Sequence, residues 1–103
     1  VALVSHTDFP YCLHMNIEFD PAKNAVNRAK HGVDMTAAGW FEFDTALVWI
    51  DDREDYGEAR EVAIGFIGDR LHVLVFTHRD SALRVISLRK ATKKEARHYA
   101  EQA

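Results

Sequence analysis

Residues 60–90 read REVAIGFIGDRLHVLVFTHRDSALRVISLRK, and this stretch decides the fold. Apolar and polar residues alternate along most of it, which is typical of strands with one buried face. Gly68-Asp69 predicts a two-residue hairpin turn, and Asp80-Ser81 provides the next turn. The expected strands are Arg60 to Ile67, Leu71 to Arg79 and Leu83 to Lys90. The stretch therefore predicts three strands that follow one another in an antiparallel meander.

The residues before this meander predict two helices. Asp20-Pro21 predicts a helix start, with the aspartate as N-cap and the proline at the first helical position. This helix is expected to run to about His31 and to stop at Gly32, a residue suited to the left-handed conformation. Asp34 can cap a second, weaker helix to about Phe43. Its apolar face is expected to be Met35, Ala38 and Phe41.

The rest of the chain predicts two more strands and a terminal helix. The strands are expected over Asn16 to Asp20 and Ala46 to Asp51. Thr92 can cap a helix over Lys93 to His98, and Glu95 completes a capping box. The order β-α-α-β-β-β-β-α predicts an α+β domain with a mostly antiparallel, meandering sheet.

Length and composition indicate one ordinary domain. The chain has 103 residues, of which 48% are hydrophobic and 28% charged, as in a typical globular protein. Residues 1–14 have no usable periodicity and are expected to be a disordered extension or an artificial remnant. The folded domain is expected over 15–103.

Other features of the sequence favour a cytoplasmic protein without a membrane role. No apolar run approaches the length of a membrane span. The opening Val1-Ala2-Leu3-Val4 is too short for the core of a signal peptide. The single Cys12 excludes an internal disulfide and fits a reducing compartment.

Charge is distributed unevenly along the chain. The net charge of −3 argues, taken alone, against a nucleic-acid binder. However, residues 1–58 carry four Lys/Arg and eleven Asp/Glu, whereas residues 59–103 carry nine and five. This asymmetry indicates an acidic half and a basic face with different partners; the alternative is two solvated surfaces.

One face of the first predicted helix is basic. Helical spacing places four polar residues on it: Lys23, Asn27, Lys30 and His31. Ala22, Val26 and Ala29 are expected to form the opposite, packing face. The basic face could contact phosphate, or it could be a solvated face on which the helix dipole favours His31.

Alternation predicts a second basic cluster on the last two strands. Val73, Val75, Thr77 and Arg79 share one side, as do Val85, Ser87 and Arg89 on the next strand. Arg84, Ile86, Leu88 and Lys90 take the other side, with Ile86 and Leu88 in the core. Arg84 would need a β-bulge or an end-of-strand position to join the cluster.

Arginines among apolar strand residues are costly unless they reach a polyanion or a carboxylate. The cluster of Thr77, Arg79, Ser87 and Arg89 therefore predicts phosphate recognition. The alternative is pairing with the acidic residues 51–58, for instance Arg60 with Glu58 or Asp55.

Other kinds of site find little support. The six histidines are scattered without metal-ligand spacing, so no metal is expected. There is no Gly-rich phosphate loop or nucleophile elbow, and no cofactor is expected. Trp40 and Trp49 are expected in the core rather than as base-stacking platforms.

An ordered set of short motifs covers about residues 16–100. The motifs are Glu18-Phe19-Asp20-Pro21-x-Lys23, Asn27-x-x-Lys30-His31-Gly32-Val33, Gly57-Glu58-x-Arg60 with Gly65, Thr77-x-Arg79, Arg84-Val85-Ile86-Ser87-x-Arg89-Lys90-Ala91-Thr92, Glu95 and Tyr99. Together they resemble the BrnT family, toxins of type II toxin–antitoxin systems with a RelE-like ribonuclease fold. The chain departs from this family at Met35 and Thr36-Ala37, which are packing positions.

The resemblance implies a bacterial ribonuclease toxin that cleaves RNA, inhibits translation and arrests growth. It also implies a cognate antitoxin, BrnA-like and DNA-binding, that neutralises the toxin and represses the operon. Both a homodimer and a hetero-oligomer with the antitoxin remain open.

Metal-independent RNA cleavage needs a base for the 2′-hydroxyl, cations for the phosphorane and an acid for the leaving oxygen. Our hypothesis assigns proton transfer to Lys30 or His31 and phosphate stabilisation to Arg79, Arg84 and Arg89. Further RNA contacts are expected from Lys23, Asn27, Arg60, Thr77, Ser87 and Lys90.

Two other functions remain open. The first is a non-catalytic RelE-like module whose basic groove only holds a partner protein. The second is an enzyme acting on a small phosphate ester, which would need a closed apolar pocket that the sequence does not indicate.

Overall fold

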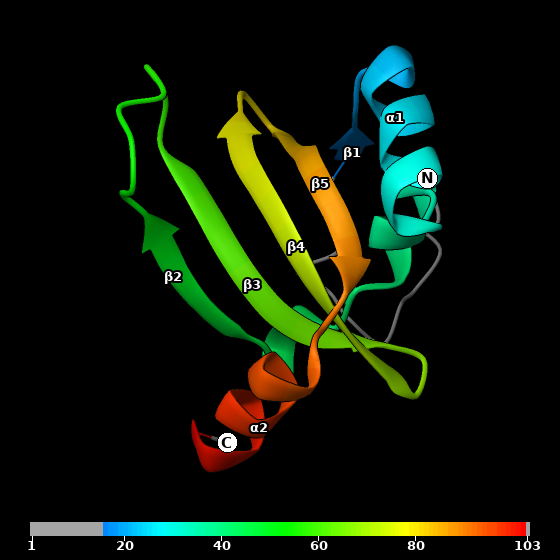
Figure 1. Ribbon diagram of the computed structural model, residues 1–103. Coiled ribbons are helices and arrows are strands. Elements are labelled where there is room, and N and C mark those ends of the chain that lie inside the picture. The colour runs from blue at the N-terminus through cyan, green and yellow to red at the C-terminus, as the bar shows by residue number, and fades with distance from the viewer. Residues whose placement is uncertain (1–15, 103) are drawn as a thin grey trace.

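A computed structural model describes residues 16–102 of the protein (Figure 1). The predicted extension, residues 1–14, lies outside this range. The elements are β1 (Asn16–Glu18), α1 (Pro21–His31), the 3₁₀ helices η3 (Met35–Trp40) and η4 (Phe43–Thr45), β2 (Leu47–Asp51), β3 (Arg60–Ile67), β4 (Arg70–Arg79), β5 (Ala82–Lys90) and α2 (Lys93–Gln102).

The strands form one five-stranded sheet in the order β1-β5-β4-β3-β2. β2 to β5 pair antiparallel in sequence order, and β1 joins β5 in parallel. The predicted meander is therefore confirmed, as is the α+β class with a mostly antiparallel sheet. In Figure 1, α1 stands at the β5 and β1 side of the sheet, and α2 lies beneath its lower end.

The predicted ends of α1 are confirmed. The Asp20 side chain accepts a hydrogen bond from the Ala22 N–H at 2.8 Å, and Gly32 adopts the left-handed conformation with φ 71°. The predicted packing face is wrong, because its members are exposed: Ala22, Val26 and Ala29. The buried residues of this helix are Asn24 and Asn27.

α1 docks through these two amides because it covers the edge of a strand, where peptide groups need partners. Asn27 Nδ2 donates to the carbonyls of Leu88 and Val33, each at 2.8 Å, and Asn27 Oδ1 accepts from the Leu88 N–H at 3.2 Å. Asn24 Oδ1 accepts from the Met35 N–H at 2.8 Å. The Asn27 side chain thus gives β5 the hydrogen bonds that a neighbouring strand would supply.

The second predicted helix is shorter and tighter than expected. It is the 3₁₀ helix η3, and Met35, Ala38 and Phe41 are indeed buried. Their spacing of three matches the 3₁₀ helix, in which residues i and i+3 lie above one another. The Phe41 ring packs against Gly65 of β3, where an added Cβ would lie 2.7 Å from Cζ of that ring. The apolar face was therefore predicted correctly, and the helix type was not.

The sheet buries a core on each face. On one face, η3 packs on a cluster that includes Leu74, Leu83 and Leu88, all 1% exposed or less. The other face carries Val62, Ile64 and Val73, and α2 adds Tyr99 to it. The Tyr99 hydroxyl donates to the Thr45 carbonyl at 2.9 Å. Because α2 reaches only one end of this second face, the rest is uncovered in Figure 1; we call it the open face.

A β-bulge in β5 changes which residues share the open face. Val75 pairs with Ser87, but the next residue, Phe76, pairs with Val85, so Ile86 is the extra residue. Val85 is consequently buried in the core and does not share a side with Ser87, which corrects the prediction. Arg84 becomes the cross-strand partner of Thr77. The bulge that Arg84 needed is present.

The two tryptophans are not core residues, contrary to the prediction. Trp40 is 52% exposed and Trp49 is 43% exposed. Trp49 lies on β2, which is the outermost strand of the sheet on its side. A residue on an edge strand has neighbours on one side only, so its ring stays accessible.

Candidate nucleic-acid interface

Five of the predicted site residues line one groove between α1 and β5. We call it the α1 groove; its volume is about 250 Å³. The predicted residues in its lining are Lys23, Asn27, Lys30, His31 and Ser87. Among the described residues, the lining contains two lysines and no carboxylate. The α1 groove is therefore a cationic surface that also holds a histidine.

His31 brings to the α1 groove a group that can exchange a proton near neutral pH without a large shift. Burial lowers the pKa of the His31 imidazole below 6.5, and the positive charges of Lys30 and Arg89 lower it further. The imidazole is thus mainly neutral at pH 7 and can accept a proton. Arg89 does not line the groove, and its charge acts on the imidazole from outside it.

Arg89 is held by a carboxylate on α2. Its Nη1 and Nη2 donate to Oε1 and Oε2 of Glu95, both at 2.7 Å. Glu95 also accepts from the Thr92 N–H at 2.8 Å, and its own N–H donates to the Thr92 hydroxyl at 3.2 Å, so the predicted capping box is confirmed. These contacts, chiefly those from Arg89, lower the pKa of Glu95 to about 2. The first turn of α2 therefore fixes the guanidinium of Arg89.

Arg89 and Glu95 form one wall of a second depression, which lies on the open face. We call it the sheet hollow; its volume is about 290 Å³. Its floor consists of Val62, Val73 and Val75, and its opposite wall contains Trp49 and the ion pair of Asp51 with Arg53.

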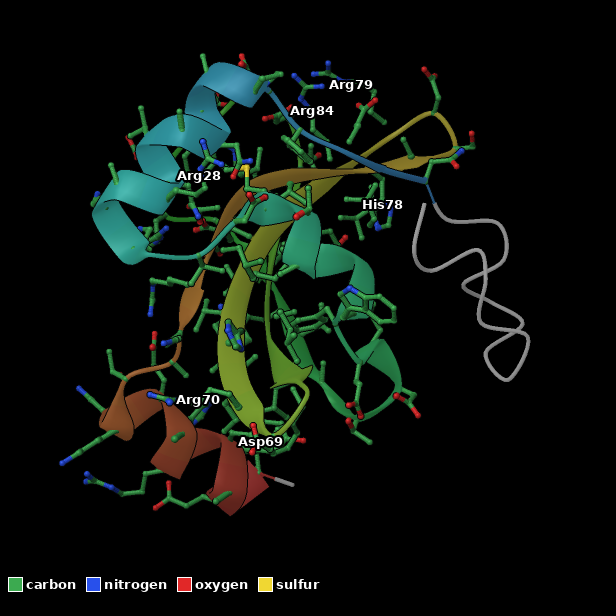
Figure 2. All side chains as sticks on the ribbon, turned by 90° about the vertical axis from the view of Figure 1, so that its right-hand side faces the viewer. Arg28, Asp69, Arg70, His78, Arg79 and Arg84 are labelled. Carbon is green, nitrogen blue, oxygen red and sulfur yellow. The ribbon has the colours of Figure 1, made fainter. Side chains whose placement is uncertain are left out.

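The remaining arginines of the predicted site gather at the other end of the sheet. Arg60 and Arg79 both pair with Glu58, at 3.3 and 3.9 Å, and Arg84 pairs with Glu18 at 3.2 Å. Figure 2 shows Arg79 and Arg84 together at this end. The pairing of Arg60 with Glu58, which was the alternative interpretation of its charge, is confirmed.

The predicted cluster is therefore divided. Arg84 and Arg89 pair with Thr77 and Val73 of β4, so the rise per residue separates them by roughly 13 Å along the sheet. Arg89 belongs with the α1 groove and the sheet hollow, whereas Arg79 and Arg84 form a separate group with Arg60.

Three predicted RNA contacts have polar groups that the fold already uses or that face away from Arg89. The Asn27 amide is buried and hydrogen-bonded within the fold. Thr77 is 4% exposed, and its hydroxyl donates to the Ala59 carbonyl at 2.6 Å. Lys90 is exposed, but its cross-strand partner is His72, so alternation places it on the face opposite Arg89.

Glu95 was not predicted to be a partner of Arg89. The capping box had already indicated its position at the start of α2, directly after β5. A side chain that faces back from this turn can reach a residue near the end of the strand. The role of Asn24 had no comparable sign, because asparagine in a helix gives no indication of burial.

Residues 16–102 contain neither a cluster of metal ligands nor a membrane-spanning helix. Over this range no three His, Cys, Asp or Glu side chains are grouped so that they could hold a metal ion. No helix in the same range is long and apolar enough to cross a membrane.

Comparison with known proteins identifies the family. A family described as the ribonuclease toxin BrnT of type II toxin–antitoxin systems matches residues 19–95, from the start of α1 to the first turn of α2. The chain belongs to the BrnT family. No curated protein matches the chain. As a BrnT protein it is a ribonuclease toxin of a type II system, a class that has an antitoxin partner.

Proposed function

We propose that this BrnT toxin cleaves single-stranded RNA without a metal ion, in the α1 groove beside Arg89. The single observation that carries this proposal is the position of His31. A histidine with a lowered pKa lies in a groove with two lysines, and the fixed guanidinium of Arg89 acts on it electrostatically. These are the base, the acid and the cation that the reaction requires.

In the proposed reaction the imidazole of His31 takes the proton of the RNA 2′-hydroxyl. The 2′-oxygen attacks the adjacent phosphorus, and the bond from phosphorus to the 5′-oxygen breaks. The ammonium of Lys30 gives a proton to that leaving oxygen. Arg89 is always protonated, so it stabilises the charge on the phosphorane and transfers no proton. The products are a 2′,3′-cyclic phosphate and a 5′-hydroxyl.

The remaining basic residues are proposed to bind the RNA on either side. Lys23 contacts a flanking phosphate at the groove, and Ser87 donates a hydrogen bond there. Phosphates farther along the RNA are bound by Arg60, Arg79 and Arg84. The carboxylates that pair with these arginines either release them to the phosphates or stay bound and weaken the attraction. Asn27 and Thr77 act through the fold, since their polar groups are already used.

The test uses purified toxin without antitoxin and a labelled single-stranded RNA in the presence of EDTA. We expect cleavage by the parent, and at least a hundredfold slower cleavage by His31→Ala and by Arg89→Ala. His98→Ala and Arg97→Ala are matched controls, because both residues are exposed on α2. Loss of activity with EDTA would overturn the metal-free mechanism, and undiminished activity of both site variants would overturn the assignment.

A non-catalytic binding module is the second candidate, and one observation favours it. Each arginine of the predicted site is paired with a carboxylate of the same chain: Arg60 and Arg79 with Glu58, Arg84 with Glu18, and Arg89 with Glu95. Paired arginines attract a polyanion less than free ones. This candidate predicts that the purified toxin binds its antitoxin tightly and leaves RNA intact.

We further propose that the partner is a BrnA-like, DNA-binding antitoxin and that both proteins act in the cytoplasm, where free toxin inhibits translation. Co-expression with the neighbouring short reading frame should restore growth that the toxin alone arrests. A neighbouring frame that binds neither the toxin nor the operon DNA would contradict this partner.

A further inference from the structure

The sheet hollow has a composition that the cleavage mechanism leaves unused. Three valines, Val62, Val73 and Val75, form its apolar floor, of which Val62 and Val73 are buried and Val75 is half-buried. Depressions with an apolar floor and a few fixed polar groups are the usual binding sites for organic ligands. The described lining of the α1 groove also contains apolar residues, Val26, Met35 and Ile86, so the two sites differ mainly in their charge.

Trp49 makes one wall of the sheet hollow an aromatic surface. Cross-strand pairing places it beside Val62, which pairs with Val75, and Val75 pairs with Ser87. The residue is 43% exposed although an apolar floor lies next to it. An accessible indole in a concave site offers a flat partner on which another aromatic ring can stack.

The charges of the sheet hollow select a neutral ligand. Its described lining holds three carboxylates and two guanidiniums, a balance of −1, in contrast to the cationic α1 groove. Asp51 is bound by Arg53 through two hydrogen bonds of 2.8 and 2.9 Å, and Glu95 is bound by Arg89 through two of 2.7 Å. A phosphate would meet net repulsion here, and a neutral planar group would not.

The fixed ion pairs still offer polar contacts at the rim of the sheet hollow. A carboxylate has four lone-pair sites and a guanidinium five N–H donors, so each pair keeps unused capacity. The edge of a nucleobase carries both donors and acceptors, and its faces stack on aromatic rings. The sheet hollow thus fits a base, and the α1 groove fits its phosphates.

We propose that the sheet hollow binds one unpaired base of single-stranded RNA, stacked on Trp49 over the valine floor. This inference rests on the proposed function, because Arg89 borders the hollow and also lies near His31. A base held in the hollow would place its own phosphate toward Ser87 and the α1 groove. Trp49 is then a binding residue that fixes the RNA relative to the site of cleavage.

The first experiment measures binding by tryptophan fluorescence. The chain has two tryptophans, so Trp40→Phe leaves Trp49 as the single reporter. We expect saturable quenching by nucleoside monophosphates and none by ribose 5-phosphate, which lacks the base. The proposal would be overturned if both compounds quenched the fluorescence equally or if neither compound quenched it. It would also be overturned if the antitoxin quenched the fluorescence and the nucleotides did not.

The second experiment separates this proposal from the nuclease proposal. An all-2′-deoxy oligonucleotide lacks the attacking hydroxyl, so its binding is measured without cleavage. Trp49→Leu should weaken its affinity about 5- to 150-fold, the range for loss of one stacked base. Val48→Ala is the matched control, because Val48 is exposed on the same strand and points to the opposite face.

The outcomes of the two experiments are distinct. Quenching by nucleotides and Trp49-dependent binding without RNA cleavage would support the base site and overturn the nuclease. RNA cleavage with unchanged kcat/KM in Trp49→Leu, together with no quenching, would overturn the base site and leave the nuclease intact.

Discussion

At the scale of single residues, the charge state of His31 depends on its neighbours. The positive charge of Lys30 disfavours the imidazolium and contributes to the lowered pKa. We therefore expect Lys30→Gln to raise the pKa of His31 toward 6.5, whereas Lys30→Arg, which keeps the charge, should leave it lowered. Titration of the His31 ring signals by NMR measures this shift directly and does not depend on activity.

The same neighbours determine the pH dependence of cleavage. With His31 as the base, the rate should fall on acidification through the pKa of His31, which lies below 6.5, and level off above it. In Lys30→Arg cleavage should be slower, because a guanidinium cannot give the proton to the leaving oxygen, but the residual rate should fall at the parent pH. A rate that falls only at pH values well above 6.5 would show that another group is the base.

Asn27 illustrates how a polar residue can be mistaken for a binding residue. Asn27→Ala removes three hydrogen bonds and leaves buried peptide groups of Leu88 and Val33 without partners. We expect it to lower the free energy of unfolding by about 2–3 kcal/mol, measured by urea denaturation. Lys23→Ala on the exposed side of the same helix is the control, with a change within about 0.5 kcal/mol. Unchanged stability of Asn27→Ala would restore Asn27 as a candidate RNA contact.

At the scale of elements, the contact of β3 with η3 depends on the absence of a side chain. A methyl group at Gly65 would lie 2.7 Å from the Phe41 ring and 3.0 Å from the Ala46 Cβ. We expect Gly65→Ala to destabilise the protein by about 1–3 kcal/mol, as overpacking does. Adding Phe41→Leu should recover part of this loss if the clash with the ring is its cause, and thermal denaturation of the single and double variants tests it.

The elements also show what sequence patterns can and cannot predict. Turn residues and alternation predicted β3, β4 and β5 almost to the residue, because Gly68-Asp69 fixes the hairpin register locally. The bulge at Ile86 was not predictable, since it depends on how β5 meets β4 and not on the residues of β5 alone. The prediction of the packing side of α1 failed for a related reason. The helix covers the edge of a strand, where side-chain amides can bind the free peptide groups and the apolar Ala22 and Val26 cannot.

At the scale of the whole molecule, three carboxylates link stability to acid. The pKa values of Asp34, Asp51 and Glu95 are each lowered to about 2, chiefly by hydrogen bonds to Thr36, Arg53 and Arg89. Groups with a lowered native pKa stabilise the fold above their ordinary pKa values, 3.8 and 4.5. We expect the contribution of these three carboxylates to the free energy of unfolding to be constant above about pH 5. This contribution should fall as the pH is lowered from about 4.5 to 2.

Urea denaturation between pH 7 and 3 measures this fall. Glu95→Gln should show a smaller fall than the parent, because the variant lacks one of the three titrating groups. Glu101→Gln, which changes an exposed residue of the same helix, should retain the parent profile. Identical profiles for the parent and Glu95→Gln would show that the contact with Arg89 does not stabilise the folded state.

The candidate site was predictable only as far as local periodicity reaches. Helical spacing correctly brought together Lys23, Lys30 and His31, and the structure adds Ser87 from β5. The prediction that Arg79 and Arg89 lie together is wrong. Alternation predicts on which side of a strand a residue lies, but it does not predict how far apart two residues are along the strand. The exposure of Trp49 depends on β2 being an edge strand, which the order of strands in the chain does not reveal.

The role of Asn27 at β5 has a consequence for association. α1 and β1 cover one edge of the sheet, whereas within residues 16–102 no strand lies beyond β2 at the other edge. β2 exposes Val48 and Ile50, at 46% and 59%, beside peptide groups that can pair with another strand. β2, with five residues against the three of β1, is therefore the longer edge at which another chain could extend this sheet. At high concentration, toxin molecules without their antitoxin should associate there with one another, and a charged residue in place of Ile50 should keep them apart.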